Sequence, residues 1–438
     1  MKKEHNMSFI RQQFNDDATH IKALNGIQPN KLAARLTALS QIGRTKAGGV
    51  TRLAYTNEEA HAKRLLTQWG KRIGLTMRED EVGNLIGRLE GTRPDLGAVA
   101  TGSHIDTVVN GGAFDGALGA IASLCAIESL LEEGKPFPRP LEWIIFVNEE
   151  GSRFPTGIYG SQVMMGEFSE ADLERYSDKD GVTLVDALKN QGFDPHKLAK
   201  AHRQHEDFYA FIELHIEQGK QLEKANIPIG VVSGIAGPLW LQGTFKGESD
   251  HAGNTPMGMR KDAAVAGAEW LVAIESLPAQ FSKTAVATVG QQTVYPNTPN
   301  VISGEVTLTV DIRDIELAQR NRLVKAIQTA GLEIAAKRGL DFSYEVLTDI
   351  APVPISLFIQ ETIKASGVKL GLPTMTLPSG AGHDAMIVGR HVPHTGMIFV
   401  PSVDGRSHCP EEFTSLDDCV KGTAVLKDVL AQLLTSTN

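Results

Sequence analysis

A nearly continuous apolar run followed directly by acidic residues constrains the fold of this chain more than any other feature. Residues 141–147 (LEWIIFV) have the length of a β-strand but not the alternation of a strand with one wet face. Such runs are typical of strands buried on both faces of a helix-covered, mostly parallel sheet. Residues 97–101 form a second short apolar strand, and the Ala- and Leu-rich residues 115–133 between the two fit a crossover helix. The sequence therefore predicts a βαβ unit in an α/β domain.

The middle of the chain has a different pattern. Residues 229–250 and 285–312 are rich in Val, Ile and Thr, and Glu305–Arg313 alternates strictly between apolar and polar residues. This alternation is typical of an antiparallel sheet with one face in water. We expect Glu305–Arg313 to be an edge strand that needs cover. Helices at about 258–276 and 315–338 are expected to accompany the strands.

The length of the chain, 438 residues, is too great for one compact core and indicates two domains. We interpret residues 231–349 as a smaller α+β domain inserted into an α/β domain. The α/β domain would comprise residues 1–230 and resume over residues 350–438. Its second part would contain a strand near 396–400 and a closing helix near 417–435.

Charge and cysteine content exclude several classes of protein. A net charge of −9 argues against binding to nucleic acid or to an anionic membrane surface. The three cysteines, Cys125, Cys409 and Cys419, have no regular spacing, which argues against a disulfide framework and fits a reducing compartment. The N-terminus has no apolar core of signal-peptide length, and no window is long and apolar enough to span a membrane. We therefore expect a cytoplasmic protein.

Five short motifs rich in His, Asp and Glu carry the candidate chemistry. Taken singly, each has an ordinary structural reading, such as a hydrogen bond, a solvated acidic pair or a turn. Together they favour a metal site, because acids that directly follow a buried strand are costly unless they are paired or bound to metal. In open α/β sheets ligands gather at the carboxyl ends of strands, where these motifs should lie. The motifs are TGSHIDT (101–107), GGAFDG (111–116), NEEG (148–151), ELHIEQG (213–219) and GRSHCP (405–410).

Residue types within the motifs indicate separate roles. In His104-Ile-Asp106 the histidine can bind metal while the aspartate accepts the other ring N–H. Asp115 lies in a Gly-rich loop, so its carboxylate could approach closely and bridge two cations. Of the adjacent acids Glu149 and Glu150, one can ligate metal while the other acts as a base over the water.

With these motifs in view, the sequence resembles the M20-type dinuclear metallohydrolases over about residues 30–430. More narrowly, it resembles the hydantoinase/carbamoylase branch, which contains N-carbamoyl-L-amino acid hydrolases, β-ureidopropionases and allantoate amidohydrolases. The resemblance implies a catalytic domain with two metals and an inserted lid and dimerisation domain. The motifs that carry it are GSHIDTVVNGGAFDGALG, NEEGSRF, LHIEQG, GESDHAGNTPM, SGAGHDA and SHCPEE.

The resemblance implies five ligands shared between two divalent ions, with Asp115 bridging them and Glu149 as the general base. His104, Asp115 and His215 would hold one ion, and Asp115, Glu150 and His408 would hold the other. Zinc, manganese, cobalt and nickel all suit mixed His and carboxylate ligands. His215 favours the carbamoylase branch, because many M20 peptidases have an acid at that position.

The resemblance also implies substrate-binding residues. His251, in the inserted domain, would hydrogen-bond the carbonyl oxygen, commonly from the partner subunit of a homodimer. An alternative is that His251 caps a turn. Arg313 with Asn300 matches a carboxylate-binding pair, although Arg313 could instead pair with Asp311 or Asp314 at the surface. The other implied substrate contacts are Gln218, Gly380 and His383.

The expected activity is hydrolysis of an N-carbamoyl-L-amino acid to the amino acid, ammonia and carbon dioxide. Trp240 in GIAGPLW resembles the carbamoylases more than the allantoate enzymes and predicts an apolar pocket wall. Allantoate amidohydrolase and β-ureidopropionase remain alternatives. A dinuclear aminopeptidase or dipeptidase is disfavoured by Arg313 and His215. A non-catalytic scaffold is disfavoured because every ligand and the base are present.

Overall fold

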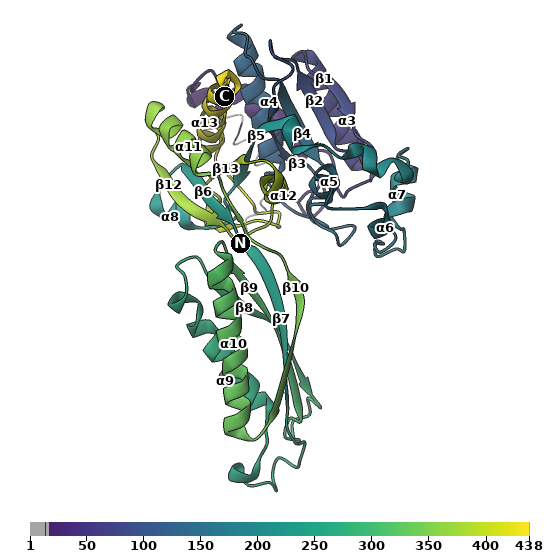
Figure 1. The fold of residues 1–438 in the computed structure, drawn as a ribbon, viewed down its shortest axis with the longest axis vertical. Helices are drawn as coiled ribbons and strands as arrows, with labels where there is room; N and C mark the ends of the chain where they lie inside the picture. The colour runs from purple at the N-terminus through teal and green to yellow at the C-terminus, as the bar shows by residue number, and fades with distance from the viewer. Residues whose placement is uncertain (1–13, 15–16, 438) are drawn as a thin grey trace. The chain divides into compact units, whose positions relative to one another are not determined.

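The computed structural model describes Phe14 and residues 17–437, which divide into two compact units (Figure 1). The first unit contains the residues up to Ser233, then Ile355–Leu377 and the residues from His383 onward. The second unit contains Gly234–Pro354 and Pro378–Gly382. The expectation that the N-terminus has no secretory signal concerns N-terminal residues that lie outside the described part of the chain.

The larger sheet has nine strands and is mainly parallel at its centre. Its order is β1-β2-β4-β3-β5-β13-β6-β11, and β12 also pairs with β6. The central strands β4, β3, β5 and β13 run parallel, so their carboxyl ends meet at one edge. The strands are β1 (Thr76–Glu79), β2 (Leu85–Leu89), β3 (Ala98–His104), β4 (Leu141–Phe146), β5 (Phe208–Ile216), β6 (Ile229–Ile235), β11 (Val353–Pro354), β12 (Thr374–Ser379) and β13 (His394–Val400).

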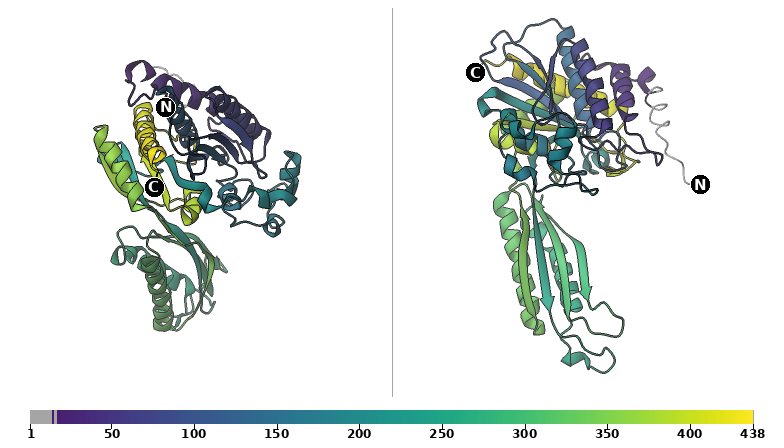
Figure 2. Two further views of the ribbon diagram at one scale, coloured as in Figure 1. Left: turned by 45° about the horizontal axis from the view of Figure 1, so that its top comes forward. Right: turned by 90° about the vertical axis from the view of Figure 1, so that its right-hand side faces the viewer.

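Helices cover both faces of this sheet, so the predicted α/β class with a helix-covered, mostly parallel sheet is confirmed (Figures 1 and 2). The predicted crossover helix is α4, which is apolar all round because it packs between the sheet, α2 and α13. The helices of this unit are α2 (Pro29–Ser40), α3 (Asn57–Arg72), α4 (Ala117–Glu132), α5 (Tyr159–Met164), α6 (Glu170–Leu173), α7 (Leu184–Asn190), α8 (Gln221–Ala225), α11 (Leu357–Lys369), α12 (Asp384–His391) and α13 (Leu416–Thr435).

Trp143 on β4 is fully buried against α4, and its indole N–H donates to the carbonyl of Ala120 at 3.0 Å. We expect Trp143→Phe to lower the free energy of unfolding by about 1–3 kcal/mol, because it removes this hydrogen bond and leaves a void. Urea unfolding followed by circular dichroism measures the change. The matched control is Trp240→Phe, at a position that is 43% exposed, where a change within about 0.5 kcal/mol is expected. Equal effects of the two substitutions would contradict this account.

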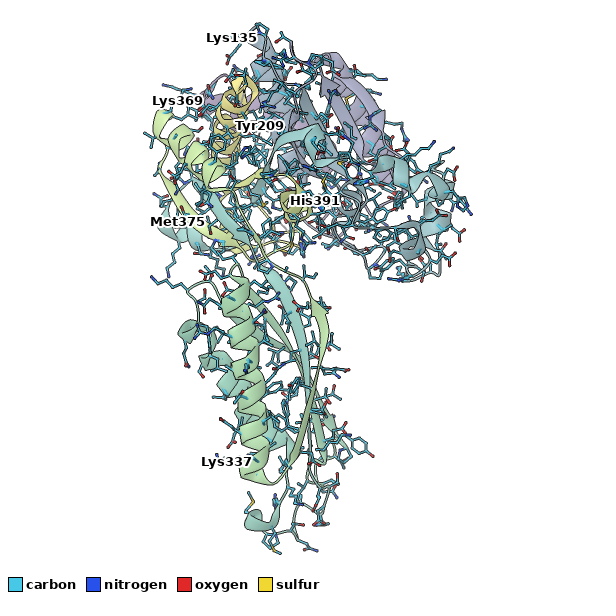
Figure 3. All side chains as sticks on the ribbon, in the orientation of Figure 1. Lys135, Tyr209, Lys337, Lys369, Met375 and His391 are labelled. Atoms are coloured by element: carbon cyan, nitrogen blue, oxygen red, sulfur yellow. The ribbon has the colours of Figure 1, made fainter. Side chains whose placement is uncertain are left out.

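The second unit is a four-stranded antiparallel sheet with two long helices. The strands are β7 (Gly237–Lys246), β8 (Val286–Tyr295), β9 (Glu305–Asp314) and β10 (Asp341–Asp349), in the order β10-β7-β9-β8. Helices α9 (Ala263–Ser276) and α10 (Leu317–Arg338) lie side by side on one face of this sheet (Figures 1 and 2). They are joined by an exposed ion pair between Lys337, labelled in Figure 3, and Glu269.

Strand β9 confirms the predicted alternation but not its predicted place. Val306, Leu308, Val310 and Ile312 are buried under the helices, and the residues between them face the other side of the sheet. However, β9 is an inner strand between β7 and β8, so the expectation of an edge strand was wrong. The alternation indicates that one face of the strand is exposed to water, but it gives no information about which strands lie beside it.

Helix α9 begins at Ala263, five residues later than expected. Asp262 caps it by accepting a hydrogen bond from the Ala264 N–H, and residues 257–259 before it form only a short 3₁₀ turn. Among residues 14 and 17–437, no helix is long and apolar enough to cross a membrane. All three cysteines are described, and none forms a disulfide.

Candidate metal centre

Parallel pairing brings two predicted histidines to the same edge of the larger sheet. His104 is the last residue of β3 and lies opposite Phe146, the last residue of β4. His215 on β5 lies opposite Phe399, one residue before the end of β13. Since β3 and β5 are neighbours, the two rings lie close together, with centroids 5.9 Å apart. Both side chains are buried.

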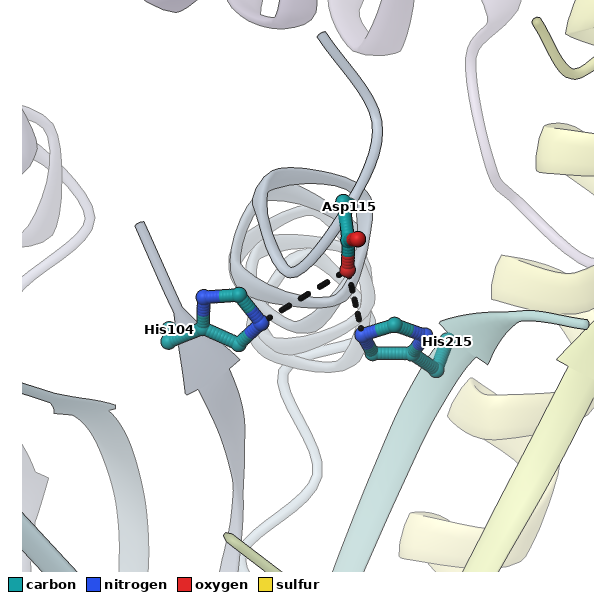
Figure 4. A group of neighbouring side chains, drawn as sticks. All are labelled: His104, Asp115 and His215. Atoms are coloured by element: carbon teal, nitrogen blue, oxygen red, sulfur yellow. Dashed lines mark ion pairs between the residues drawn. The ribbon is translucent and has the colours of Figure 1, made fainter. Parts of the chain in front are cut away.

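Asp115 lies between these histidines, as Figure 4 shows. Its Oδ1 is 3.2 Å from Nε2 of His215 and 3.7 Å from Nε2 of His104. The loop that carries it ends in Gly116, whose φ of +59° suits glycine. A Cβ on Gly116 would lie 2.4 Å from the His104 ring, so this position leaves room for the histidine. The three side chains form one group that could hold a metal ion.

The other oxygen of Asp115 faces a second group. Oδ2 is 3.2 Å from Nε2 of His408, and this nitrogen is 3.4 Å from Oε2 of Glu150. Asp115, Glu150 and His408 thus form a second set that could hold a metal ion. One carboxylate therefore offers one oxygen to each set, which is the geometry of a bridging ligand.

The acidic pair follows a left-handed turn at the end of β4. Asn148 has a φ of +53°, a conformation that asparagine tolerates better than most residues. Its amide donates to the carbonyl of Thr156 at 2.9 Å, which fixes the turn. Glu149 then lies beside the first set, with Oε2 3.7 Å from Nε2 of His104. Glu150 belongs to the second set.

The Asp106 carboxylate contacts groups that the His-x-Asp motif did not predict. Its carboxylate accepts the backbone N–H groups of Glu149 (3.2 Å) and Glu150 (3.1 Å). Nδ1 of His104 is 3.1 Å from the backbone carbonyl of Asp106 and 3.6 Å from its carboxylate. The nearer acceptor for the ring is therefore the backbone carbonyl of Asp106, and the carboxylate, which we expected to accept the ring N–H, also fixes the turn that carries the acids.

Burial and close charges shift the pKa values of these acidic side chains. Burial raises the pKa of Glu150 to about 8, and the nearby Asp115 carboxylate adds to the shift. Burial also raises the pKa of Glu149 well above its ordinary value, although His104 opposes this. Burial opposes ionisation of Asp115 too, yet hydrogen bonds with His215 and His408 hold its pKa well below the usual range.

Divalent cations fit this donor set. Imidazole nitrogens and carboxylate oxygens are the common ligands of first-row transition metals. Oε1 of Glu150 is buried and has no hydrogen-bond partner among the described residues, so it offers a free acceptor at the second set. A bound cation would favour the ionised forms of the two glutamates, whose pKa values are raised mainly by burial and further by neighbouring carboxylates.

Gln218 contacts the Asp115 carboxylate. Its amide donates to Oδ2 of Asp115 at 2.8 Å and to Oγ of Ser407 at 3.2 Å. Its backbone has a φ of +55° and donates to Oγ of Ser402. Sequence reasoning placed Gln218 at the substrate, and the structure places it against Asp115.

His383 is buried against the first set. It precedes α12, and its ring centroid is 4.5 Å from that of His215. Burial lowers its pKa well below the ordinary value, and the charge of His215 acts in the same direction. Together with Glu213 and His215 it forms a third group of potential ligand atoms.

The second unit brings His251 and Asn300 together. His251 forms an isolated β-bridge with Val301, and the Ala252 N–H donates to the carbonyl of Asn300. Nδ1 of His251 accepts the backbone N–H groups of Gly253 (3.0 Å) and Asn254 (3.1 Å), so the ring does cap a turn. In a neutral ring the proton is then on Nε2, and this N–H can donate a hydrogen bond.

Arg313 is held by Asp311 on the same strand. Its Nε and one terminal nitrogen donate to the two carboxylate oxygens of Asp311 at 2.9 and 2.7 Å. The other terminal nitrogen donates to the carbonyl of Gly380 at 2.7 Å. The alternative pairing of Arg313 with Asp311 is therefore present, and it fixes the guanidinium on the open face of the sheet beside Gly380.

Sequence reasoning assigned no role to two buried acids near the centre, Glu213 and Asp384. Glu213 accepts hydrogen bonds from Oγ of Ser103 (2.7 Å) and from the Ala385 N–H (3.1 Å). Asp384 accepts one from Oγ of Ser161 at 2.6 Å. Both lie inside motifs already recognised, next to or two residues from a predicted histidine. The strand period was the available signal for Glu213, because residues 213 and 215 of β5 share a face.

Comparisons with known proteins agree with this architecture. Residues 100–432 match the family described as Peptidase family M20/M25/M40. The chain is 42% identical to an N-carbamoyl-L-amino acid amidohydrolase of Geobacillus stearothermophilus, over 93% of this chain and 99% of the relative. It is 37% identical to an allantoate amidohydrolase of Bacillus subtilis, over 92% and 97%. A solved amidase of the hydantoinase/carbamoylase family from Burkholderia multivorans shares 33% identity, with coverage of 94% and 99% and a TM-score of 0.86.

Proposed function

Because the chain belongs to peptidase family M20/M25/M40, in its amidohydrolase branch, we propose that it is an N-carbamoyl-L-amino acid hydrolase. The proposed reaction hydrolyses the linear C–N bond between the carbamoyl carbon and the amino-acid nitrogen. The amino acid leaves through its nitrogen, and the carbamic acid formed by attack of water breaks down to ammonia and carbon dioxide. The observation that carries the chemistry is the position of Asp115, whose two oxygens face two separate sets of ligand atoms.

The M20 family is metal-dependent, and the donors described above suit two divalent ions such as zinc, manganese, cobalt or nickel. His104, Asp115 and His215 would hold one, and Asp115, Glu150 and His408 the other. Bound there, the ions would supply Lewis acidity that lowers the pKa of the attacking water and polarises the scissile carbonyl.

Glu149 is the proposed general base. Its carboxylate is buried beside His104 but is not part of either ligand set, so it is available to a water molecule at the centre. It would take a proton from the water as the oxygen attacks the carbamoyl carbon. It would then return that proton to the leaving amino-acid nitrogen.

The residues of the second unit are assigned to substrate recognition. His251 would donate from Nε2 to the carbonyl oxygen as negative charge develops, because its Nδ1 is already an acceptor. We assign this His251 to a second copy of the chain in a homodimer. Arg313 and Asn300 would bind the substrate carboxylate, and Gln218, Gly380 and His383 would line the pocket. A guanidinium matches a carboxylate by bidentate geometry.

Ammonia release by metal-loaded protein from a panel of ureido acids tests the proposal. The panel contains an N-carbamoyl-L-amino acid, N-carbamoyl-β-alanine and allantoate, with a dipeptide, followed by amino-acid release, as control for peptidase activity. The proposal predicts turnover of the first substrate above the others. Turnover of allantoate alone would assign the chain to allantoate hydrolysis, an alternative supported by the 37% identical relative. Cleavage of the dipeptide alone would contradict the amidohydrolase assignment.

We expect Arg313→Lys to raise KM for an N-carbamoyl-L-amino acid about 10–100-fold and to change kcat less. An ammonium cannot reproduce the planar fork of the guanidinium, and a charged hydrogen bond contributes about 1.5–3 kcal/mol. Steady-state kinetics measure the change. Arg338→Lys is the matched control, because Arg338 lies in the same unit and pairs with Glu269 on the outer helices. An unchanged KM for Arg313→Lys would remove Arg313 from the binding site.

A further inference from the structure

Glu412 is a buried acid that the proposed reaction does not use. It is only 1% exposed and lies in the C-terminal segment, four residues after His408. Oε1 of Glu412 accepts the backbone N–H groups of Phe114 at 2.8 Å and Asp115 at 2.9 Å. A carboxylate that accepts two successive N–H groups fixes the backbone of the loop that bears them. Here that loop carries the candidate bridging residue.

The second oxygen of Glu412 reaches the Asp115 side chain through one hydroxyl group. Oγ of Ser407 is 2.8 Å from Oε2 of Glu412 and 2.8 Å from Oδ2 of Asp115. Oδ2 is also the oxygen that faces His408. Glu412 therefore contacts Asp115 directly at the backbone and indirectly at the carboxylate.

Gly112 leaves space for this carboxylate. A Cβ on Gly112 would lie 2.0 Å from Oε1 of Glu412 and 2.1 Å from its carboxyl carbon. Any side chain at this position would displace the carboxylate from the loop. Gly112 and Glu412, which lie far apart in the sequence, thus form one structural unit around Asp115.

From these contacts we infer that Glu412 is a positioning residue for the metal centre. It holds Asp115 so that Oδ1 faces His104 and His215 while Oδ2 faces His408. The same C-terminal segment supplies both His408 and Glu412, so it brings one candidate ligand and orients another. This inference rests on the proposed function only in taking Asp115 as a metal ligand.

Metal affinity without substrate tests the inference. Mn²⁺ would be titrated into metal-free wild type, Glu412→Ala, Glu412→Gln and Gly112→Ala by calorimetry. Loss of a residue that orients a ligand typically weakens metal binding about 10–100-fold, and this is expected for Glu412→Ala and Gly112→Ala. Glu412→Gln should stay within about threefold of wild type, because its amide oxygen can accept the two N–H groups and its NH₂ can donate to Ser407. The matched control is Glu411→Ala, an exposed neighbour, which should bind like wild type.

The outcomes separate this inference from the proposed function. Wild type that binds neither Mn²⁺ nor, in parallel titrations, Zn²⁺, Co²⁺ or Ni²⁺ would overturn both. Wild type that binds while Glu412→Ala and Gly112→Ala bind equally well would overturn only the inference. A purely structural role would lower the melting temperature of metal-free Glu412→Ala and leave Mn²⁺ affinity unchanged, which would also overturn it. If Glu412→Ala does not fold, Gly112→Ala tests the same contact with Glu412 retained. Equal losses in Glu412→Gln and Glu412→Ala would contradict the hydrogen-bonding account.

Discussion

A Glu149→Gln variant is expected to bind its metal ions normally and to lose kcat by a factor of about 10²–10⁴. Glutamine has the same shape as glutamate but cannot take a proton from water at neutral pH. The side chain lies outside both ligand sets, so the substitution should leave metal binding intact. Its backbone N–H would still donate to Asp106, which keeps the turn after β4 in place.

The measurement combines steady-state ammonia release with metal analysis of the purified variant. Glu411→Gln is the control for the same chemical change, at an exposed position near His408. KM should change little, because Glu149 acts on the water and not on the substrate carboxylate. Full turnover by Glu149→Gln with a full complement of metal would exclude Glu149 as the base.

Replacing Asp115 by alanine is expected to remove the metal ions and lower activity about 10³-fold or more. Each oxygen of Asp115 serves a different set, so the substitution leaves two protein ligands in each. The cations are expected to supply several kcal/mol of transition-state stabilisation, and each 1.4 kcal/mol corresponds to a factor of ten in rate. Metal content by mass spectrometry and ammonia release are the two readouts.

Circular dichroism would check that metal-free Asp115→Ala is folded, because the substitution also removes the contacts of Asp115 with His215 and His408. Asp95→Ala, at an exposed loop position, is the control and should retain both metal and activity. An Asp115→Ala protein that still bound two equivalents of metal would rule out a bridging role. Binding of one equivalent would assign Asp115 to a single set.

The local features of the fold could be predicted from the sequence because they depend on neighbouring residues. The apolar run of residues 141–147 forms β4, and the strict alternation of Glu305–Arg313 forms β9. The position of β9 inside its sheet was not predictable from its pattern, since strand order depends on contacts between distant segments. The start of α9 was missed because Asp262 was not recognised as its cap.

The candidate site, like the fold, could be predicted from the sequence only in part. The motifs identified which residues gather, and the family resemblance is confirmed by the match to residues 100–432. The sequence could not show that Asp106 engages the backbone of the acidic pair, because backbone contacts leave no residue pattern. It also could not distinguish the adjacent acids Glu411 and Glu412, of which only the second is buried.

The position of β13 within the larger sheet affects how the chain folds while it is being synthesised. β13 lies between β5 and β6, although it is synthesised more than 150 residues after both. At about 5–20 residues per second, a ribosome needs on the order of ten seconds or more to deliver the missing strand. During that time β5 and β6 have open edges, which are sites of incorrect pairing between chains. Correct pairing of β5 and β6 within the larger sheet is therefore completed only after β13 has been synthesised.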